Sequence, residues 1–222
     1  MTTQEELFTS SKPVVGEVEK LLDNRDVATV IGVDEAGRGP LAGPVYAGAF
    51  WLELSAESLD ELAALDDSKK LDLATREKLY EELVRGERPY AIASVGAQII
   101  DEINILQATF RAMTKAVEDV IATAGAEPDV VLVDGNLAIP QGTWKQRPIV
   151  GGDQRSIAIA AASVLAKVAR DRFMCEADHD WPDYGFSSHK GYGTPQHRQA
   201  LRDHGPCTLH RRSFAGVVQD SP

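Results

Sequence analysis

The most constraining feature of the sequence is an apolar run that ends in two carboxylates and a glycine-rich loop. Residues 30–33 read VIGV, Asp34 and Glu35 follow, and residues 36–44 read AGRGPLAGP. Apolar β-branched residues favour a buried strand, and Pro44 favours the start of the next strand over its interior. Residues 28–53 therefore predict a strand, a turn and a second strand. Two acids stand at the end of the first strand, where burial is costly unless the charge is paired or bound to a cation.

Strand-like and helix-like segments alternate along the rest of the chain. Further strands are predicted at residues 90–95, 130–133 and 149–150, and helices at 59–65, 74–86, 97–124, 157–172 and 194–204. The helix over 97–124 is expected to break near Asn104, and the alanine-rich helix over 157–172 is expected to pack closely on the sheet. The alternation predicts a single α/β domain over residues 28–216, after a polar lead-in over residues 1–27.

Composition and charge exclude some classes of protein and leave others open. No run of eighteen apolar residues and no signal-like N-terminus occur, and two cysteines suit a reducing compartment, so we expect a cytoplasmic chain without a membrane span. The net charge of −11 disfavours nucleic-acid binding by itself. However, residues 155–212 carry nine Lys/Arg against six Asp/Glu and all five histidines, so this part could face a polyanion.

A second carboxylate ends a second buried run. Asp134 follows VVLV at residues 130–133, much as Asp34 follows VIGV. Two such acids in one sheet suggest a shared hard cation with oxygen ligands, although Asp134 before a glycine could simply cap a turn. In a regular strand Asp34 and Glu35 point to opposite faces, so a shared site requires the strand to end or bend at this pair. Asp153 and Asp171, at opposite ends of one predicted helix, compete for a fourth ligand position.

Several polar segments could contact a ligand. The loop around Gly37, Arg38 and Gly39 suits close backbone approach to a phosphate, but it lacks the spacing of a nucleotide-cofactor motif. Lys69 could contact a phosphate or could be solvated charge. Tyr192, in the segment SHKGYG, could stack on a nucleic acid or belong to a surface turn. The histidines have no zinc-like spacing and are expected on the surface or facing nucleic acid.

Taken together, the motifs resemble one family, bacterial ribonuclease HII. The stretches are VDEAGRGPLAGPV at 33–45, LDDSKKL at 65–71, VLVDGN at 131–136, GDQRS at 152–156, AASVLAKVARDR at 161–172, HKGYGT at 189–194 and HRRSF at 210–214. The resemblance implies a ribonuclease H-like α/β fold, in which helices flank a mixed β-sheet and a small C-terminal helical part follows. It also implies a metal-dependent endonuclease that cleaves the RNA strand of RNA–DNA hybrids.

The resemblance also implies the finer chemistry. Cleavage would include the 5′ side of single ribonucleotides embedded in duplex DNA, leaving 3′-hydroxyl and 5′-phosphate ends, with Mn²⁺ or Mg²⁺ as cofactor. The chain would act as a monomer on RNA–DNA hybrid and ribonucleotide-containing duplex DNA. Gly151 departs from the family pattern, since many relatives carry lysine there.

Residue roles follow from the same resemblance. The metal ligands would be Asp34, Glu35, Asp134 and Asp153, which leaves Asp171 as a structural or supporting residue. The loop around Gly37, Arg38 and Gly39 would recognise the 2′-hydroxyl, Lys69 a phosphate and Tyr192 the sugar at the RNA–DNA junction. The alternatives are a catalytically silent nucleic-acid-binding module of the same fold and a phosphatase or nucleotidyl-transfer enzyme acting on small nucleotides.

Overall fold

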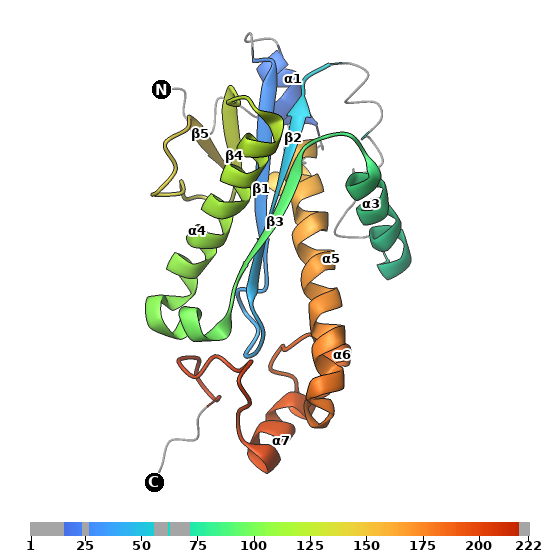
Figure 1. The fold of residues 1–222 in the computed structure, drawn as a ribbon, viewed down its shortest axis with the longest axis vertical. Helices are drawn as coiled ribbons and strands as arrows, with labels where there is room; N and C mark the ends of the chain where they lie inside the picture. The colour runs from blue at the N-terminus through green and yellow to red at the C-terminus, as the bar shows by residue number, and fades with distance from the viewer. Residues whose placement is uncertain (1–15, 24–26, 56–61, 63–71, 218–222) are drawn as a thin grey trace.

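The computed structural model describes residues 16–23, 27–55, 62 and 72–217, which are built around a five-stranded mixed sheet (Figure 1). The strands are β1 (Thr29–Ala36), β2 (Val45–Glu53), β3 (Tyr90–Val95), β4 (Val130–Asp134) and β5 (Gln146–Ile149). Their order across the sheet is β3-β2-β1-β4-β5. β1 pairs antiparallel with β2 and parallel with β4, so it is the central strand. The mixed sheet expected from the sequence is confirmed.

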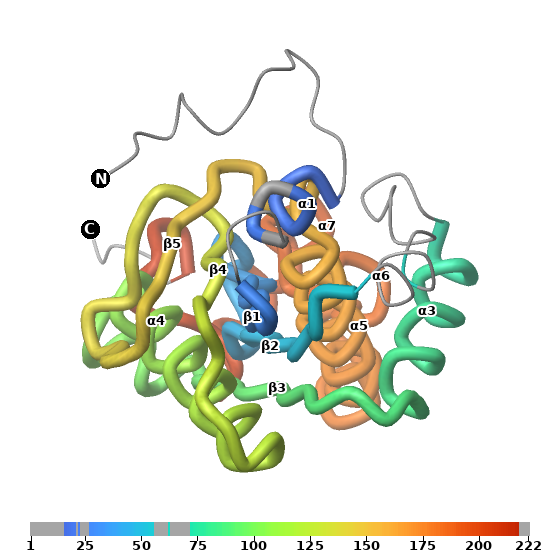
Figure 2. Tube along the Cα trace, turned by 90° about the horizontal axis from the view of Figure 1, so that it is seen from above, coloured from blue at the N-terminus to red at the C-terminus, as the bar shows by residue number. Residues whose placement is uncertain are grey.

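Helices cover both faces of this sheet. α4 (Ala97–Ala124) lies against one face and α5 (Ile157–Asp180) against the other, as the view from above shows (Figure 2). α1 (Glu17–Asp23) packs at the start of α5, and α3 (Leu73–Arg85) packs beside α5. The short helices α6 (Phe186–His189) and α7 (Pro195–His204) form the expected small C-terminal helical part at one end of the molecule (Figure 1).

Two glycines let α5 lie unusually close to the sheet. A Cβ added at Gly32 of β1 would stand 2.1 Å from the backbone carbonyl carbon of Ala158, and one added at Gly48 of β2 would stand 2.3 Å from the carbonyl oxygen of Ala162. These atoms are backbone and cannot rotate away, so any side chain at either glycine separates helix from sheet. The alanine-rich face of α5 therefore packs directly on β1 and β2, as its composition predicts.

Gly32→Ala should destabilise the protein strongly for this reason. We expect the free energy of unfolding to fall by about 2–3 kcal/mol or more, because the added methyl overlaps backbone on the facing helix. Urea unfolding followed by tryptophan fluorescence measures this change. Gly96→Ala is the matched control, because a Cβ there meets nothing within 4 Å, and we expect a change below about 1 kcal/mol. A similar loss in both variants would contradict the close-packing argument.

Most predicted elements are present, and the differences lie at their ends. α4 is interrupted at Asn104, whose φ of 66° and ψ of 164° confirm the predicted break. α5 continues beyond Arg172 to Asp180, and β5 begins at Gln146, three residues before the predicted start. The helix predicted over residues 59–65 lies almost wholly outside the described residues. Among the described helices, none is long and apolar enough to cross a membrane.

Candidate functional site

Three carboxylates, Asp34, Glu35 and Asp134, lie at the end of the two central parallel strands, close enough for their charges to influence one another. β1 and β4 pair in register up to Val33 and Val133, so Asp34 and Asp134 are the next residues on adjacent strands. Strand alternation places both on the face that α5 covers. Glu35 belongs to the opposite face of β1. The sequence left open whether the strand ends or bends at Asp34 and Glu35, and in the structure β1 stays paired with β2 through Ala36.

The charge of Asp134 acts on both Asp34 and Glu35, although these two residues belong to opposite faces of β1. Burial, then the charge of Asp134, then that of Glu35 raise the pKa of Asp34 well above its usual range. Burial also raises the pKa of Glu35, the charge of Asp134 adds to this, and a hydrogen bond from Arg38 opposes it. The negative charge of Asp134 therefore contributes to the raised pKa of both residues. The surroundings of Asp34 and Glu35 therefore disfavour their charged forms.

Local hydrogen bonds hold Asp34 in place. Its Oδ1 atom accepts the backbone N–H of Glu35 at 2.7 Å, and the side chain also hydrogen-bonds Ser163 of α5. Ser163 reaches this position because Gly48, the cross-strand partner of Asp34, lets α5 approach the sheet. The close packing of α5 therefore sets the position of this carboxylate.

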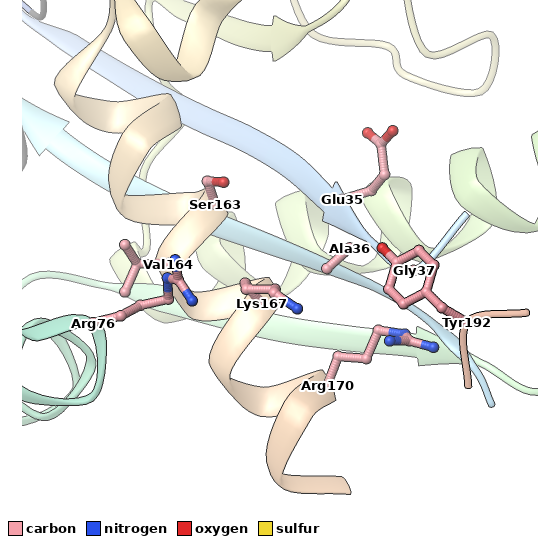
Figure 3. A pocket seen from close by; sticks show the side chains of 9 residues that line it. All are labelled: Glu35, Ala36, Gly37, Arg76, Ser163, Val164, Lys167, Arg170 and Tyr192. Carbon is pink, nitrogen blue, oxygen red and sulfur yellow. The ribbon is translucent and has the colours of Figure 1, made fainter. Parts of the chain in front are cut away.

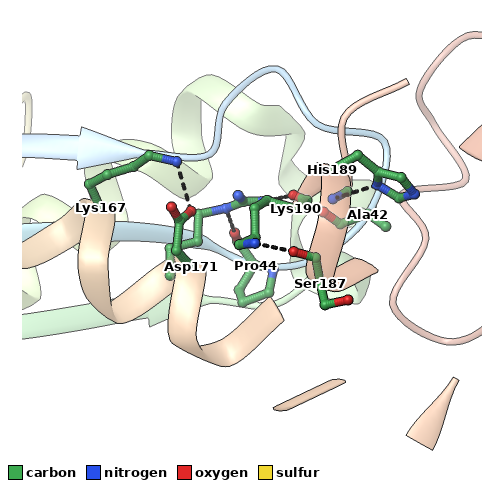
Figure 4. Close-up of polar contacts among 9 residues, drawn as sticks. Ala42, Pro44, Lys167, Asp171, Ser187, His189 and Lys190 are labelled. Carbon is green, nitrogen blue, oxygen red and sulfur yellow. Dashed lines mark hydrogen bonds and ion pairs between the residues drawn. The ribbon is translucent and has the colours of Figure 1, made fainter. Parts of the chain in front are cut away.

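Asp153 lies on a turn that is fastened to the same cluster. The 3-10 turn η3 (Gly152–Gln154) precedes α5, and the N–H of Gly152 donates to Oδ1 of Asp134 at 2.7 Å. Asp153 itself is buried. Asp171, its competitor in the sequence, lies near the other end of α5 and pairs with Lys167 at 2.7 Å (Figure 4). The structure therefore brings the turn of Asp153, and not Asp171, to the end of β4.

The carboxylates suit a hard divalent cation in their chemistry. They offer only oxygen ligands, and a cation would stabilise the charged forms of Asp34 and Glu35, whose pKa values are raised by burial first and by neighbouring carboxylates second. Within the part of the chain that the structure describes, no three His, Cys, Asp or Glu side chains already form a metal-binding group. By donor type and charge these residues nevertheless fit a divalent metal.

A pocket of about 260 Å³ opens beside Glu35 (Figure 3). Glu35 and Tyr192 line it, and α5 contributes the positively charged groups of Lys167 and Arg170. The remaining lining residues come from β1, the glycine loop, α3 and α5: Ala36, Gly37, Arg76, Ser163 and Val164. An anionic group could therefore enter next to the acidic cluster while basic side chains offset its charge.

Two buried arginines hold the glycine-rich loop, and the sequence analysis missed both. Arg211 donates to the carbonyl oxygens of Gly37, Arg38, Pro40 and Gly43 at distances between 2.6 and 2.9 Å. Burial, with the charge of Arg170 in second place, lowers the pKa of Arg211 to about 9. The guanidinium of Arg211, which comes from the C-terminal part, therefore shapes the loop. Burial disfavours its charged form, and the four loop carbonyls are its hydrogen-bond acceptors.

Arg170 holds the other side of the loop. It donates to the carbonyl oxygens of Pro44 and Ala42 at 3.1 and 3.2 Å and to that of Lys190 at 3.0 Å (Figure 4). Gly37 has a φ of 95°, and a Cβ there would stand 2.0 Å from Nε of Arg170. Only glycine fits at this point of the loop. Sequence motifs contain both arginines, but no local signal separates a buried arginine from a solvated one.

Tyr192 and Arg38 both lie near Glu35. The ring of Tyr192 is 47% exposed, lines the pocket and would stand 3.8 Å from a Cβ at Gly39. Arg38 forms a half-exposed ion pair with Glu35 at 3.2 Å. The loop of Gly37, Arg38 and Gly39 therefore shares one site with Tyr192. Lys69 lies outside the described residues.

The histidines contradict the expectation of surface positions. His189, His197 and His210 are buried in the C-terminal part, and only His179 and His204 are exposed. The Nε2 atoms of His197 and His210 lie 3.0 Å apart, and the rings of His189 and His197 stack with centroids 4.4 Å apart. The sequence missed this because the three rings come together only through the turns between residues 189 and 210.

Buried neutral histidines should make the protein less stable in mild acid. Burial, then the charge of His197, lower the pKa of His210 to about 4, whereas the unfolded chain keeps the ordinary value of 6.5. As pH falls from 6.5 towards 4, His210 becomes protonated in the unfolded state but stays neutral in the folded state. The free energy of unfolding should therefore drop by up to about 3 kcal/mol across this window, and no further below it.

The raised pKa of Asp34 acts in the opposite direction, so the wild type alone does not isolate this effect. The measurement is urea unfolding between pH 7 and 4 for wild type and His210→Gln. The variant should lose less stability than the wild type over this range. Parallel curves would contradict a neutral buried His210.

Comparison with known proteins identifies the family of this chain. The family model described as Ribonuclease HII matches residues 31–217. The ribonuclease HII of Caldicellulosiruptor bescii is 47% identical over 198 residues, covering 89% of this chain and 92% of that protein.

Solved structures of related enzymes share the fold. The ribonuclease H2 from Pyrococcus horikoshii OT3 superposes with a TM-score of 0.71 at 24% identity, over 85% of this chain and 95% of that one. Bst-RNase HIII in complex with Mn²⁺ gives a TM-score of 0.67 at 18% identity, over 86% of this chain and 68% of that one. At these identities the structures support the fold alone, and they confirm the expected ribonuclease H-like architecture.

Proposed function

Because the chain belongs to the ribonuclease HII family, whose members are nucleases with ribonuclease H activity on RNA–DNA hybrids, we propose that it also nicks duplex DNA on the 5′ side of a single embedded ribonucleotide. The products would carry 3′-hydroxyl and 5′-phosphate ends. The observation that carries this proposal is the carboxylate cluster of Asp34, Glu35 and Asp134, which lies beside a pocket with basic side chains. The same cluster supports an enzyme over a silent binding module.

The acidic residues would hold Mn²⁺ or Mg²⁺. Asp34, Glu35, Asp134 and Asp153 are the proposed ligands, supported by the charge of Asp134 acting on Asp34 and Glu35 and by the hydrogen bond that joins the turn of Asp153 to Asp134. Bound divalent ions would lower the pKa of an attacking water and neutralise charge on the scissile phosphate. Ser163 and the Glu35 N–H hold Asp34 ready for this role.

The loop beside the cluster would recognise the ribonucleotide. Gly37, Arg38 and Gly39 would contact the 2′-hydroxyl through backbone groups, since the two buried arginines fix the loop in shape. A site built to hydrogen-bond a hydroxyl strongly disfavours the analogue that lacks it, because its polar groups are then left unpaired. This would account for selection of RNA over DNA at the cleaved position.

Basic and aromatic side chains would hold the strand. Arg38 and Lys167 line the approach to the carboxylates and suit backbone phosphates, and Lys69 is proposed for the same role from the sequence alone. The exposed ring of Tyr192 would stack on the sugar at the RNA–DNA junction. We propose further that the chain acts as a monomer in the cytoplasm.

The test is cleavage of a duplex that contains one ribonucleotide in one DNA strand. With Mg²⁺ or Mn²⁺ we expect a single nick on its 5′ side, resolved on a denaturing gel, and a product that a DNA polymerase can extend from its 3′-hydroxyl. An all-DNA duplex of the same sequence is the negative control, and an RNA–DNA hybrid is the positive one. Cleavage of the hybrid without the single nick would refute the finer proposal and leave the family activity standing.

A further inference from the structure

Two buried histidines hold the backbone of Tyr192 from both sides. The Tyr192 N–H donates to the carbonyl oxygen of His189 at 2.9 Å, and its carbonyl oxygen lies 2.9 Å from Nδ1 of His197. The Thr194 N–H reaches the same carbonyl at 2.8 Å. The ring, by contrast, is half exposed and faces the pocket. The residue is therefore fixed at its backbone and open at its side chain.

The hydrogen bonds behind Tyr192 form a chain with a defined direction. The backbone N–H of Cys207 can only donate, and it points at Nδ1 of His210 over 3.0 Å. His210 must then carry its proton on Nε2, which lies 3.0 Å from Nε2 of His197. His197 accepts there, so its own proton is on Nδ1 and is donated to the Tyr192 carbonyl. This direction assigns one tautomer to each neutral ring.

The histidine side chains of this hydrogen-bond chain are buried and packed against other rings. His197 is fully buried and His210 is 2% exposed. His189 stacks on His197, and Phe186 meets the His197 ring edge-on with centroids 5.6 Å apart. The same lowered pKa values that predict acid sensitivity for His197 and His210 keep both rings neutral near pH 7. A hydrogen bond between neutral groups in such a place is worth more than at the surface.

We propose that His210 and His197 are positioning residues that hold the Tyr192 ring in place for the substrate, through the hydrogen-bond chain from Cys207 N–H to the Tyr192 carbonyl. This inference rests on the proposed substrate role of Tyr192. It assigns a function to histidines that touch neither the carboxylates nor the pocket. Its energetic origin is preorganisation, because a ring already held in position loses less entropy when a nucleotide stacks on it.

A double-mutant cycle tests the proposal with the single-ribonucleotide duplex. His197→Leu removes the donor, and Tyr192→Ala removes the ring. Each should lower kcat/KM about tenfold, as expected for one stacking contact. Combined, they should lower it no further than Tyr192→Ala alone, because His197 acts only through the ring. His197→Asn keeps an amide donor near the Nδ1 position and should stay within about threefold of wild type. His179→Leu, an exposed histidine on α5, is the control and should leave kcat/KM unchanged.

The outcomes separate this inference from the function on which it rests. No effect of Tyr192→Ala would remove the substrate role of the ring, and the inference with it. A loss for Tyr192→Ala with multiplying losses in the double variant would overturn the inference alone, since it would show a separate structural role for His197.

Nitrogen-15 NMR of wild-type imidazoles tests the chain without any variant. At pH 7 it should show the Nε2–H tautomer of His210 and the Nδ1–H tautomer of His197. The opposite tautomer in either ring would overturn the proposal, even if His197→Leu did not fold.

Discussion

Asp34→Asn should abolish cleavage and, without metal, make the protein more stable. The side chain keeps its size and an oxygen that can accept the Glu35 N–H. It loses the charge that burial, Asp134 and Glu35 all disfavour. Activity should fall at least about a hundredfold, because even residues that merely support metal ligands commonly cost that much. The melting temperature in EDTA should rise, since the folded state no longer holds a repelled carboxylate.

Three measurements check this prediction together. Cleavage is measured on the hybrid with Mg²⁺, duplex affinity by fluorescence anisotropy in EDTA, and the melting temperature by differential scanning calorimetry in EDTA and in Mg²⁺. Affinity in EDTA should stay near the wild-type value, and the stabilisation of the wild type by Mg²⁺ should shrink in the variant. Asp119→Asn, an exposed acid on α4 that pairs with Lys115, should change none of these values appreciably.

A lower melting temperature in EDTA together with full activity would contradict the role of Asp34. In that case the raised pKa would report burial only, and the metal would have to be held elsewhere. Loss of affinity in parallel with activity would instead place Asp34 in duplex binding. Lost activity combined with gained stability is the result expected for a metal ligand whose buried charge destabilises the protein in the absence of the ion.

Arg211→Met should cost about 3–5 kcal/mol of stability and distort the glycine loop. The variant leaves four loop carbonyls without the guanidinium that joins them, and removing one partner of a buried charged network has costs of this size. Removal of a buried charge offsets part of the loss, because burial already lowers the pKa of Arg211. We still expect a net loss, since methionine fills the space but donates to none of the four oxygens.

Urea unfolding gives the stability change, and the ratio of activities on RNA-containing and all-DNA duplexes reports the shape of the loop. Arg212→Met is the matched control, because the neighbouring arginine is exposed, and we expect a change within about 0.5 kcal/mol. Equal effects at positions 211 and 212 would contradict the proposal that one buried guanidinium shapes the loop. A destabilised Arg211→Met with unchanged selectivity would separate loop shape from recognition of the ribonucleotide.

Local patterns in the sequence were sufficient for most elements and for where the proposed ligands stand in the chain. The apolar run before Asp34 and the run before Asp134 became the two central parallel strands. Asn104 marked the break in α4. Such features depend on a few neighbouring residues, so a single sequence is enough to detect them.

Only the tertiary structure shows how Asp34 and Glu35 lie relative to one another. From the sequence, a shared site required the strand to end or bend at this pair, because alternation separates neighbours. The strand instead continues, and Asp134 on the next strand lies close enough to raise the pKa of both residues. A contact between strands about 100 residues apart has no local signature, since it depends on register and not on spacing.

The sequence and the tertiary structure therefore account for different features of the residues around Asp34 and Glu35. Sequence by itself determined which acids end buried strands, which family the motifs resemble, and that a glycine loop follows the first pair. Tertiary structure decided that Arg211 and Arg170 shape this loop, that three histidines are buried behind Tyr192, and that α5 presses Ser163 against Asp34. The physical reason is that side-chain type sets local backbone preference, whereas burial and partnership are set by whatever distant segment packs alongside.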